Sequence, residues 1–396
     1  MTSTETRFTP RLSADFFDRV QQLVREDAAA AGFAALFSDD PEDVAYLTGF
    51  FHHPCERPVA VWVPVDGACV LLLPELEREH AESQHARAEI VSYAEYPGVV
   101  PPFAALAAAV GPSGIVGHAV STSFQRLAAV REQLPQWQFQ PTELVVRARF
   151  GKHPEEIALH AEAARITDQM LSAGVALVAD AVAAGAALPT EAELAAHVTS
   201  TGVRTMYAEH DDVVVVSPLA GGLVYAGANS AYPHGLPSGY RLRAGDTFML
   251  SLGCAVGGRF VEGERTFLLG EPTSEQVRYY EAVRAAQEIG GHAIRPGVAC
   301  AEVNRVCLQV IRDAGFGGFL RHRQGHGIGL GMHEPPWLED GDPTLLAEGM
   351  IVSNEPGIYI PGHAGYRISD SMLVTAEGAR PLTSFPRDLA HAVIAV

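Results

Sequence analysis

One stretch constrains the fold more than any other, residues 245–266, with the sequence GDTFMLSLGCAVGGRFVEGERT. Its apolar residues and central glycines predict two strands joined by a tight turn. Because side chains alternate faces along a strand, Glu262 and Glu264 project to the same side. The neighbouring residues are apolar, so we expect both carboxylates to lie in a buried sheet. Buried neighbouring carboxylates need a cation, which predicts a metal, an arginine or a cationic substrate beside them.

Composition limits the class of protein. The 396 residues are 47% hydrophobic and 19% charged, which is typical of a soluble globular chain with two domains. A formal net charge of -19 disfavours nucleic acid or an anionic membrane as a partner. The cysteines form no C-x-x-C pair, which favours reduced thiols. The first residues lack the pattern of a secretory leader, and no apolar run reaches the about 18 residues of a membrane span. We therefore expect a cytoplasmic protein.

The chain divides into two patterns. Strand and helix signals alternate at the beginning, which predicts an N-terminal α/β domain over residues 1–152. Helical periodicity then recurs at residues 155–182, 190–203, 273–294 and 301–314. Strand signals follow each pair of helices, so we expect a pseudo-symmetric α+β domain over residues 153–396.

Four polar residues outside the central stretch are candidates for chemistry. His326 and His333 stand in GHGIGLGMHEPP, where glycines allow close backbone approach and imidazole serves as a metal ligand or proton shuttle. Two structural histidines in a tight turn would give the same pattern. Glu355 ends an apolar strand, and His234 follows Pro233 in a loop. A lone Glu at a strand end is more often solvated, and an isolated loop histidine usually has no chemical role, so each residue alone is a weak signal.

In their order along the chain, these blocks resemble the pita-bread hydrolases, which include methionine aminopeptidase, prolidase, aminopeptidase P and creatinase. The resemblance covers nearly the whole sequence. The matching segments are YLTGF at 46–50, KHPEEI at 152–157, PHG at 233–235, the stretch at 245–266, GHGIGL and HEPP within 325–336, NEPGIY at 354–359 and GYRISD at 365–370. The resemblance implies a pita-bread catalytic domain after a smaller α/β creatinase/prolidase-type domain, and a homodimer.

The resemblance also bears on metal binding. Metal-dependent members hold two divalent ions with two Asp, one His and two Glu. The corresponding positions here are Ser251, Glu262, His326, Glu355 and Ser369. Because a hydroxyl is a poor substitute for a carboxylate on a divalent cation, we expect no metal. If one ion of Mn, Zn or Co does bind, the expected ligands are Glu262, His326 and Glu355.

Other residues resemble creatinase, the member that works without metal. Glu264 stands directly before the Arg-Thr of the second strand, and the resemblance implies that Glu264 and Glu355 hold a cationic or amide-like group. It implies that His234 acts as general base on water and then as acid on the leaving nitrogen. His333 is expected beside them as a further catalytic residue.

The same resemblance implies how a substrate is bound. Arg57, from an N-terminal loop, or Arg367 would anchor a substrate carboxylate, and His326 and Glu262 would complete the substrate-binding set. The expected function is metal-independent hydrolysis of a C–N bond in a small amino-acid-like molecule. Two alternatives stay open, namely an Xaa-Pro dipeptidase or aminopeptidase with a single divalent metal, and a non-catalytic peptide-binding relative.

Overall fold

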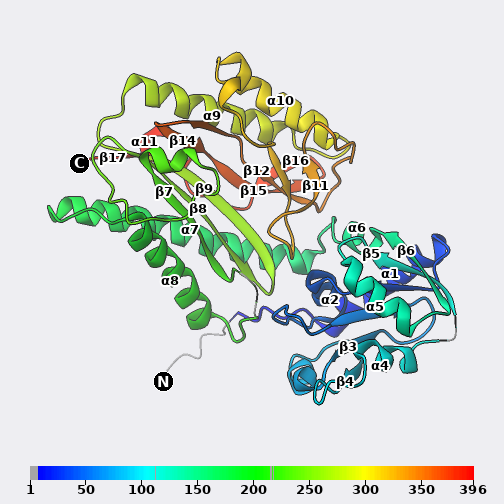
Figure 1. Ribbon diagram of the computed structural model, residues 1–396. Helices are drawn as coiled ribbons and strands as arrows, with labels where there is room; N and C mark the ends of the chain where they lie inside the picture. Colours follow the sequence, from blue (N-terminus) through cyan, green and yellow to red (C-terminus); the bar gives the residue numbers. More distant parts are fainter. Residues whose placement is uncertain (1–7, 112, 215, 217) are drawn as a thin grey trace, which may run out of the picture. The chain divides into compact units, whose positions relative to one another are not determined.

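The computed structural model describes residues 8–111, 113–214, 216 and 218–396 (Figure 1). Contacts divide this chain into two compact units. The smaller unit is formed largely by Arg11–Arg149, and the larger by Phe150–Val213 together with residues 218–396. Each unit has its own sheet and its own apolar core.

The smaller unit is built on a six-stranded sheet of mixed direction, in the order β4-β3-β2-β1-β5-β6. Its strands are β1 (Ala35–Ser38), β2 (Ala60–Pro64), β3 (Val70–Pro74), β4 (Glu89–Tyr93), β5 (Gly114–Ala119) and β6 (Trp137–Thr142). Its helices are α1 (Ala14–Ala30), α2 (Pro41–Thr48), the 3-10 helix η1 (Glu75–Glu77), α3 (Arg78–Ser83), α4 (Pro102–Ala109), α5 (Phe124–Gln133) and α6 (Leu144–Ala148). Trp62 and Trp137 meet edge to face in its core, with ring centroids 4.8 Å apart. The predicted α/β character is confirmed.

A nine-stranded sheet dominates the larger unit, in the order β11-β10-β12-β15-β9-β8-β7, with β16 on β15 and β17 on β9. Its strands are β7 (Ala220–Ala226), β8 (Thr247–Val256), β9 (Arg259–Leu269), β10 (Gly325–Gly327), β11 (Glu334–Leu338), β12 (Ile351–Asn354), β15 (Ser369–Thr375), β16 (Gly378–Pro381) and β17 (Val393–Ile394). A separate hairpin pairs β13 (Gly357–Ile360) with β14 (Ala364–Arg367).

Two pairs of helices pack on this sheet, α7 with α8 and α9 with α10 (Figure 1). The helices of this unit are α7 (Pro154–Ala183), α8 (Glu191–Glu209), the 3-10 helix η2 (Gly227–Ala231), α9 (Ser274–Ala293), α10 (Cys300–Asp313), the 3-10 helix η3 (Gly317–Phe319) and α11 (Leu389–Ala392). Thr190 caps α8 and Thr273 caps α9, each through a reciprocal capping box. Helices followed by strands, twice over, confirm the predicted α+β plan.

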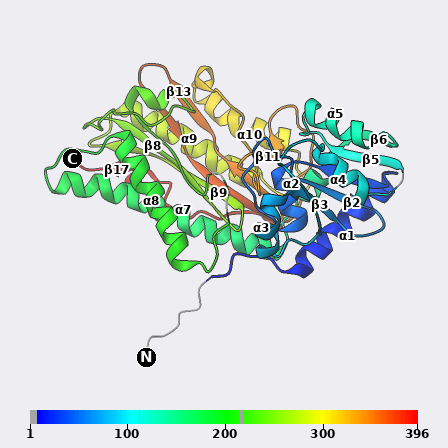
Figure 2. The same ribbon diagram turned by 60° about the horizontal axis from the view of Figure 1, so that its bottom comes forward.

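Helix α7 is the helix in the described chain that is long and apolar enough to cross a membrane. It packs against β8, β9 and α8 (Figures 1 and 2). Its Ile166, Met170 and Leu171 side chains are fully buried there. We therefore interpret α7 as a core helix of the larger unit.

The hairpin of β8 and β9 is the predicted pair of strands. Gly257 and Gly258 form its turn with φ of 54° and 78°, a left-handed region that favours glycine. The register places Ser251 of β8 opposite Glu264 of β9, and Glu264 opposite Ser369 of β15. Residues paired across strands share a face, so these three side chains lie in one row. Both strands and the turn are confirmed.

Candidate active site

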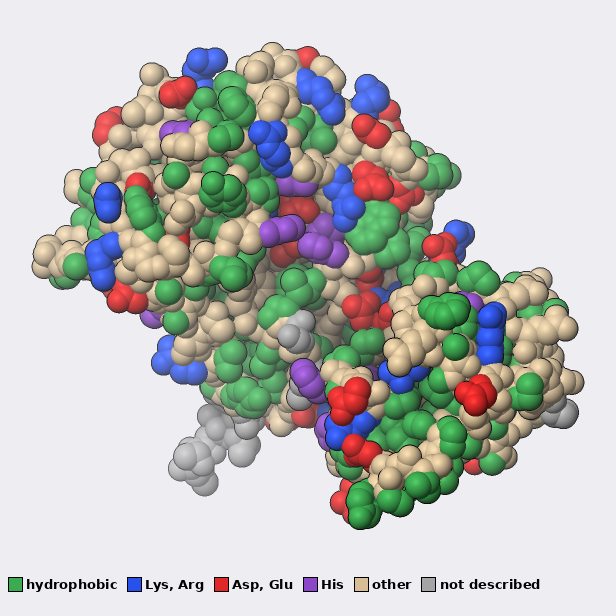
Figure 3. Space-filling view, in the orientation of Figure 1, with side chains coloured by type: hydrophobic (Ala, Val, Ile, Leu, Met, Phe, Trp, Pro, Cys, Tyr) green, Lys and Arg blue, Asp and Glu red, His purple; other side chains and the backbone are tan. Residues whose placement is uncertain are grey.

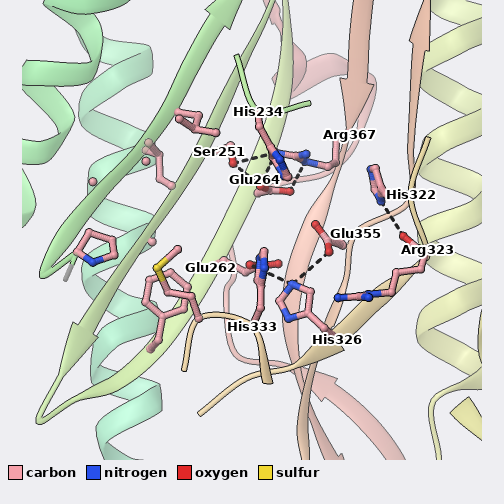
Figure 4. A pocket seen from close by; sticks show the side chains of 18 of the residues that line it. His234, Ser251, Glu262, Glu264, His322, Arg323, His326, His333, Glu355 and Arg367 are labelled. Atoms are coloured by element: carbon pink, nitrogen blue, oxygen red, sulfur yellow. Dashed lines mark hydrogen bonds and ion pairs between the residues drawn. The ribbon is translucent and has the colours of Figure 1, made fainter. Parts of the chain in front are cut away.

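A cavity of about 440 Å³ opens in the larger unit. Figure 3 shows histidines and acidic side chains gathered in a recess on this face of the unit. The predicted residues that line the cavity are His234, Glu262, Glu264, His326, His333, Glu355 and Arg367 (Figure 4). The fold therefore brings together segments that are far apart in the sequence.

His326 lies between two carboxylates. Its Nδ1 donates to the Gly327 carbonyl at 3.0 Å, and its Nε2 lies 3.2 Å from Glu355 Oε1 and 3.8 Å from Glu262 Oε2 (Figure 4). Although burial opposes its charge, Glu262 and Glu355 raise the pKa of His326 to about 9. Burial and the nearby Glu355 raise the pKa of Glu262 to about 8. The cluster therefore carries exchangeable protons near neutral pH.

Glu264 is held by an arginine of the protein itself. Arg367 Nε lies 2.5 Å from Glu264 Oε2, and Arg367 Nη2 donates to Glu264 Oε1 at 2.7 Å. Both side chains are almost fully buried. This hydrogen bond and close ion-pair contact satisfy the predicted need of the carboxylate pair for a cation. Glu264 and Arg367 are thus partners of each other, and their expected roles toward a substrate cation and a substrate carboxylate stay predictions.

Hydroxyl groups complete the surroundings of this ion pair. Arg367 donates to the hydroxyls of Tyr359 at 2.9 Å, Tyr225 at 3.0 Å and Ser251 at 2.9 Å. Ser251 in turn donates to Glu264. Acceptors therefore enclose the guanidinium. Ser251 occupies a metal-ligand position of the family, but here its hydroxyl hydrogen-bonds to both members of the Glu264–Arg367 ion pair.

His234 lies in a turn that follows η2, with its side chain exposed to the cavity. Three hydrogen bonds hold the segment around this turn: Tyr225 donates to the Pro233 carbonyl at 2.9 Å, and buried Glu191 accepts from the flanking Ala226 and Ser238 amides at 2.6 and 2.9 Å. A fixed turn keeps an imidazole available at the cavity wall.

His333 lies beside His326, with ring centroids 4.1 Å apart. Partial burial and the neighbouring His326 lower the pKa of His333 to about 4. His333 is therefore neutral at physiological pH and offers a hydrogen-bond donor to a bound molecule.

Arg57 belongs to the smaller unit. It pairs with Glu95, Nη2 to Oε1 at 2.6 Å, and with Glu56 at 3.0 Å. The cavity lining in the larger unit does not include it. Its role as a carboxylate anchor stays a prediction.

Sequence reasoning missed His322 and Arg323, which line the cavity, and Tyr359, which is buried beside it in contact with His322 and Arg367. His322 and Arg323 stand shortly before the glycine-rich block, and Tyr359 ends NEPGIY. His322 Nε2 lies 2.8 Å from the Tyr359 hydroxyl, and Arg323 lines the cavity. Their positions next to the matching sequence segments were the signal that could have identified them.

The donor set suits one divalent ion. Ligand atoms of Glu262, His326 and His333 lie within 4.8 Å of one another, as do those of Glu262, Glu264 and Glu355. Imidazole and carboxylates around one ion make a workable site. The second group is less suited to a metal ion, because Arg367 already neutralises the charge of Glu264. The expectation that no metal takes part is not supported, whereas a second ion does not fit these residues.

We expect at most one divalent ion per chain. Ser251 and Ser369 offer hydroxyls where carboxylates would be needed, and Ser369 donates to Glu262 at 2.9 Å. Calorimetric titration with Mn²⁺ or Zn²⁺ measures the stoichiometry. The variant with Ser251→Asp, Glu262→Asp and Ser369→Glu should gain a second ion, and two ions on the wild-type chain would contradict the assignment.

Metal affinity should rise with pH. The raised pKa values of Glu262, about 8, and His326, about 9, mean that both groups hold protons at pH 6. A metal ligand must be deprotonated, so binding at low pH has to displace these protons, and the competition fades as pH passes 8 to 9. Titrations in buffers of different ionisation enthalpy should show proton release at pH 7. Binding without proton release, with an affinity independent of pH, would refute this expectation.

Comparisons with known proteins agree with this architecture. Residues 158–376 match metallopeptidase family M24, and residues 19–149 match the creatinase/prolidase N-terminal domain. The chain is 30% identical to a putative dipeptidase, YkvY of Bacillus subtilis, over 94% of this chain and 98% of that protein. It is 32% identical to a probable dipeptidase, PepE of Mycobacterium tuberculosis, over 96% of this chain and 97% of that protein.

Solved structures of dipeptidases are also similar to this chain. The dipeptidase PepE from Mycobacterium ulcerans is similar with a TM-score of 0.84 and 27% identity, over 98% of this chain and all (100%) of that chain. An Xaa-Pro dipeptidase from Bacillus anthracis is similar with a TM-score of 0.82 and 26% identity, over 95% of this chain and 99% of that one. The similarity thus extends through both units.

Proposed function

The chain belongs to metallopeptidase family M24, and we propose that it hydrolyses the amide C–N bond of dipeptide-sized substrates. The dipeptidases and the Xaa-Pro dipeptidase to which it is similar along nearly its whole length support a peptide substrate. Our sequence-based preference for a creatinase-like reaction therefore takes second place, and the dipeptidase alternative comes first.

One observation carries the proposal. His326 lies between Glu262 and Glu355 in a cavity of about 440 Å³, whose wall also carries His234 and His333. Although burial opposes it, His326 lowers the pKa of Glu355 to about 2, so this carboxylate is charged at neutral pH. This charge, beside imidazoles that exchange protons, suits one cation, either a divalent ion or the ammonium end of a short peptide.

The side chains of this chain have separate tasks in the proposed reaction. His234 takes a proton from water and returns it to the leaving nitrogen. Neutral His333 donates a hydrogen bond to the carbonyl oxygen as negative charge develops there. Glu262 and His326 would hold one divalent ion together with Glu355, whose Oε1 lies 3.2 Å from His326 Nε2, and the ion would supply polarisation of the scissile carbonyl.

A substrate panel tests the proposal. Purified protein is incubated with Xaa-Pro and other dipeptides, with one equivalent of Mn²⁺, Zn²⁺ or Co²⁺ and with a chelator, and products are identified by mass spectrometry. We expect two free amino acids from at least one dipeptide. A panel that stays intact under every condition would contradict the proposal and favour a non-catalytic, peptide-binding role.

A second candidate is metal-independent hydrolysis of a C–N bond in a small molecule such as creatine. Ser251 and Ser369 favour it because they remove carboxylates from the family's ligand set. The Glu264–Arg367 pair weighs against a substrate guanidinium at Glu264, since an internal guanidinium already fills that position. Creatine belongs in the same panel, and turnover unaffected by chelator would select this candidate.

A further inference from the structure

The segment KHPEEI at residues 152–157 belongs to the family resemblance, yet none of its residues lines the cavity. Lys152 Nζ lies 2.9 Å from Glu334 Oε1 and donates to the Phe150 carbonyl at 3.3 Å. The side chains of Lys152 and Glu334 are each 4% exposed. Since a charge buried to this degree is costly without a counter-ion, each of the two needs the other. The segment therefore supplies a buried cation to the residue that directly follows His333.

The carboxylate of Glu334 also holds the glycine-rich block. Its Oε2 accepts from the Gly331 amide at 3.2 Å. A Cβ on Gly329 would lie 2.2 Å from Glu334 Oε1, so glycine is required for the block to close on this carboxylate. The Gly329 carbonyl in turn accepts from the Phe260 amide of β9 at 2.8 Å. Glu334 therefore fixes the backbone of the block between β10 and β11.

Two consecutive residues connect this anchor with the cavity. Glu334 begins β11 and pairs with Gly327 of β10. Side chains of consecutive residues in an extended segment point to opposite sides. His333 lines the cavity beside His326, whereas Glu334 points away from the cavity to Lys152. An anchor on Glu334 thus determines where the imidazole of His333 lies.

A second residue of the same segment anchors β9. Glu156 pairs with Arg259, with Oε1 2.9 Å from Nη2 and side chains 7% and 2% exposed. Beside these pairs, His160 donates from Nδ1 to the Phe260 carbonyl at 2.8 Å. Burial and the charge of Lys152 lower the pKa of His160 to about 3, so this histidine is neutral and leaves the two ion pairs balanced. The segment therefore anchors both the glycine-rich block and β9 from outside the cavity lining.

We propose that Lys152 is a positioning residue for His333, and that it acts through Glu334 to hold the imidazole where it donates to the substrate carbonyl oxygen. This inference rests on the proposed peptide hydrolysis. A donor stabilises the charge that develops in the transition state only at the right distance, and a displacement of about 1 Å can cost about 10²-fold in rate. Loss of the anchor should therefore lower kcat and leave KM nearly unchanged.

The test removes both charges of the pair. Lys152→Met combined with Glu334→Gln leaves no unpaired buried charge, so the chain can fold. With a dipeptide that the wild-type enzyme cleaves, kcat should fall by roughly 10- to 100-fold and KM should change by less than about threefold. In a His333→Ala background the same two substitutions should lower kcat by less than about twofold, because the pair acts only through His333. An equal further loss in both backgrounds would overturn the inference.

The matched control is the pair of Arg149 and Asp43 in the smaller unit, whose side chains are 4% and 1% exposed. Arg149→Met combined with Asp43→Asn also removes a buried ion pair, and it should leave kcat within about twofold of the wild-type value. A fall as large as that of the Lys152 and Glu334 variant would mean that the loss of any buried pair has this effect, which would overturn the inference.

Failure of this inference differs from failure of the proposed function. Unchanged kcat in the Lys152 and Glu334 variant would overturn the role of Lys152 and leave peptide hydrolysis intact. If the wild-type protein cleaves no peptide, amide hydrogen exchange of residues 328–333, followed by mass spectrometry, decides. Exchange there should be at least about 10-fold faster in the variant and unchanged in the control, because the block has lost its anchor. Equal exchange in the variant and the wild-type protein would overturn the inference.

Discussion

Arg367→Met should lower the free energy of unfolding of the larger unit by about 3 to 5 kcal/mol, the cost of a buried charge left without its partner. Glu264 is 4% exposed and would lose both its hydrogen bond and its ion-pair contact with the guanidinium. Ser251 would remain as a neutral donor, which does not replace a cation. Urea unfolding followed by circular dichroism measures the loss.

A double variant separates the loss of stability caused by an unpaired charge from the loss caused by the changed shape of the side chains. Arg367→Met combined with Glu264→Gln removes both charges, so it should recover most of the lost stability. The matched control is the exposed pair of Glu302 and Arg305 on α10, whose side chains are 48% and 60% exposed. Breaking that pair should change stability by less than about 1 kcal/mol. A single Arg367→Met variant as stable as the wild type would show that the buried pair is not needed to neutralise Glu264.

His234→Ala should lower kcat by roughly 10²- to 10⁴-fold, the usual contribution of general acid and base catalysis. The side chain is exposed to the cavity and the backbone of its turn is held by Tyr225 and Glu191, so the substitution removes the imidazole without disturbing these contacts. Steady-state kinetics with a dipeptide that the wild-type enzyme cleaves measures this change in kcat.

His292→Ala is the control for this variant, because His292 is exposed on α9 and lies outside the cavity lining. It should retain wild-type turnover. Near-normal kcat in His234→Ala would remove His234 from the proton transfers, and His333 would be the next residue to test.

Local patterns predicted much of the fold. The alternation of Glu262 and Glu264 with apolar residues placed both carboxylates on one buried face, as found in β9. Thr190 and Thr273 gave the starts of α8 and α9 because a capping box is a short-range signal. Helix α8 runs to Glu209, beyond the predicted end near residue 203, because helix-forming residues continue and Met206 is buried against its neighbours.

Contacts between residues far apart in the sequence could not be predicted from local sequence patterns. Glu264 and Arg367 are 103 positions apart, and their contact depends on how β9, β15 and the hairpin of β13 and β14 are arranged. The sequence indicated that a cation was required and left open which one. Likewise, Arg323 gains its orientation from Trp337 and its weak pairing from Glu339, neither of which is visible in the spacing of HRQGHG.

Hydrolysis in water labelled with heavy oxygen tests the central claim most directly. The protein is loaded with one equivalent of Mn²⁺ and incubated with a dipeptide mixture, and mass spectrometry follows the free amino acids. The account predicts that the amino acid from the N-terminal position gains one labelled oxygen in its new carboxylate, and that His234→Ala slows this gain by at least about 10²-fold. Dipeptides that remain intact, with or without a divalent ion, would contradict the assignment of this cavity as a peptide-hydrolysing site.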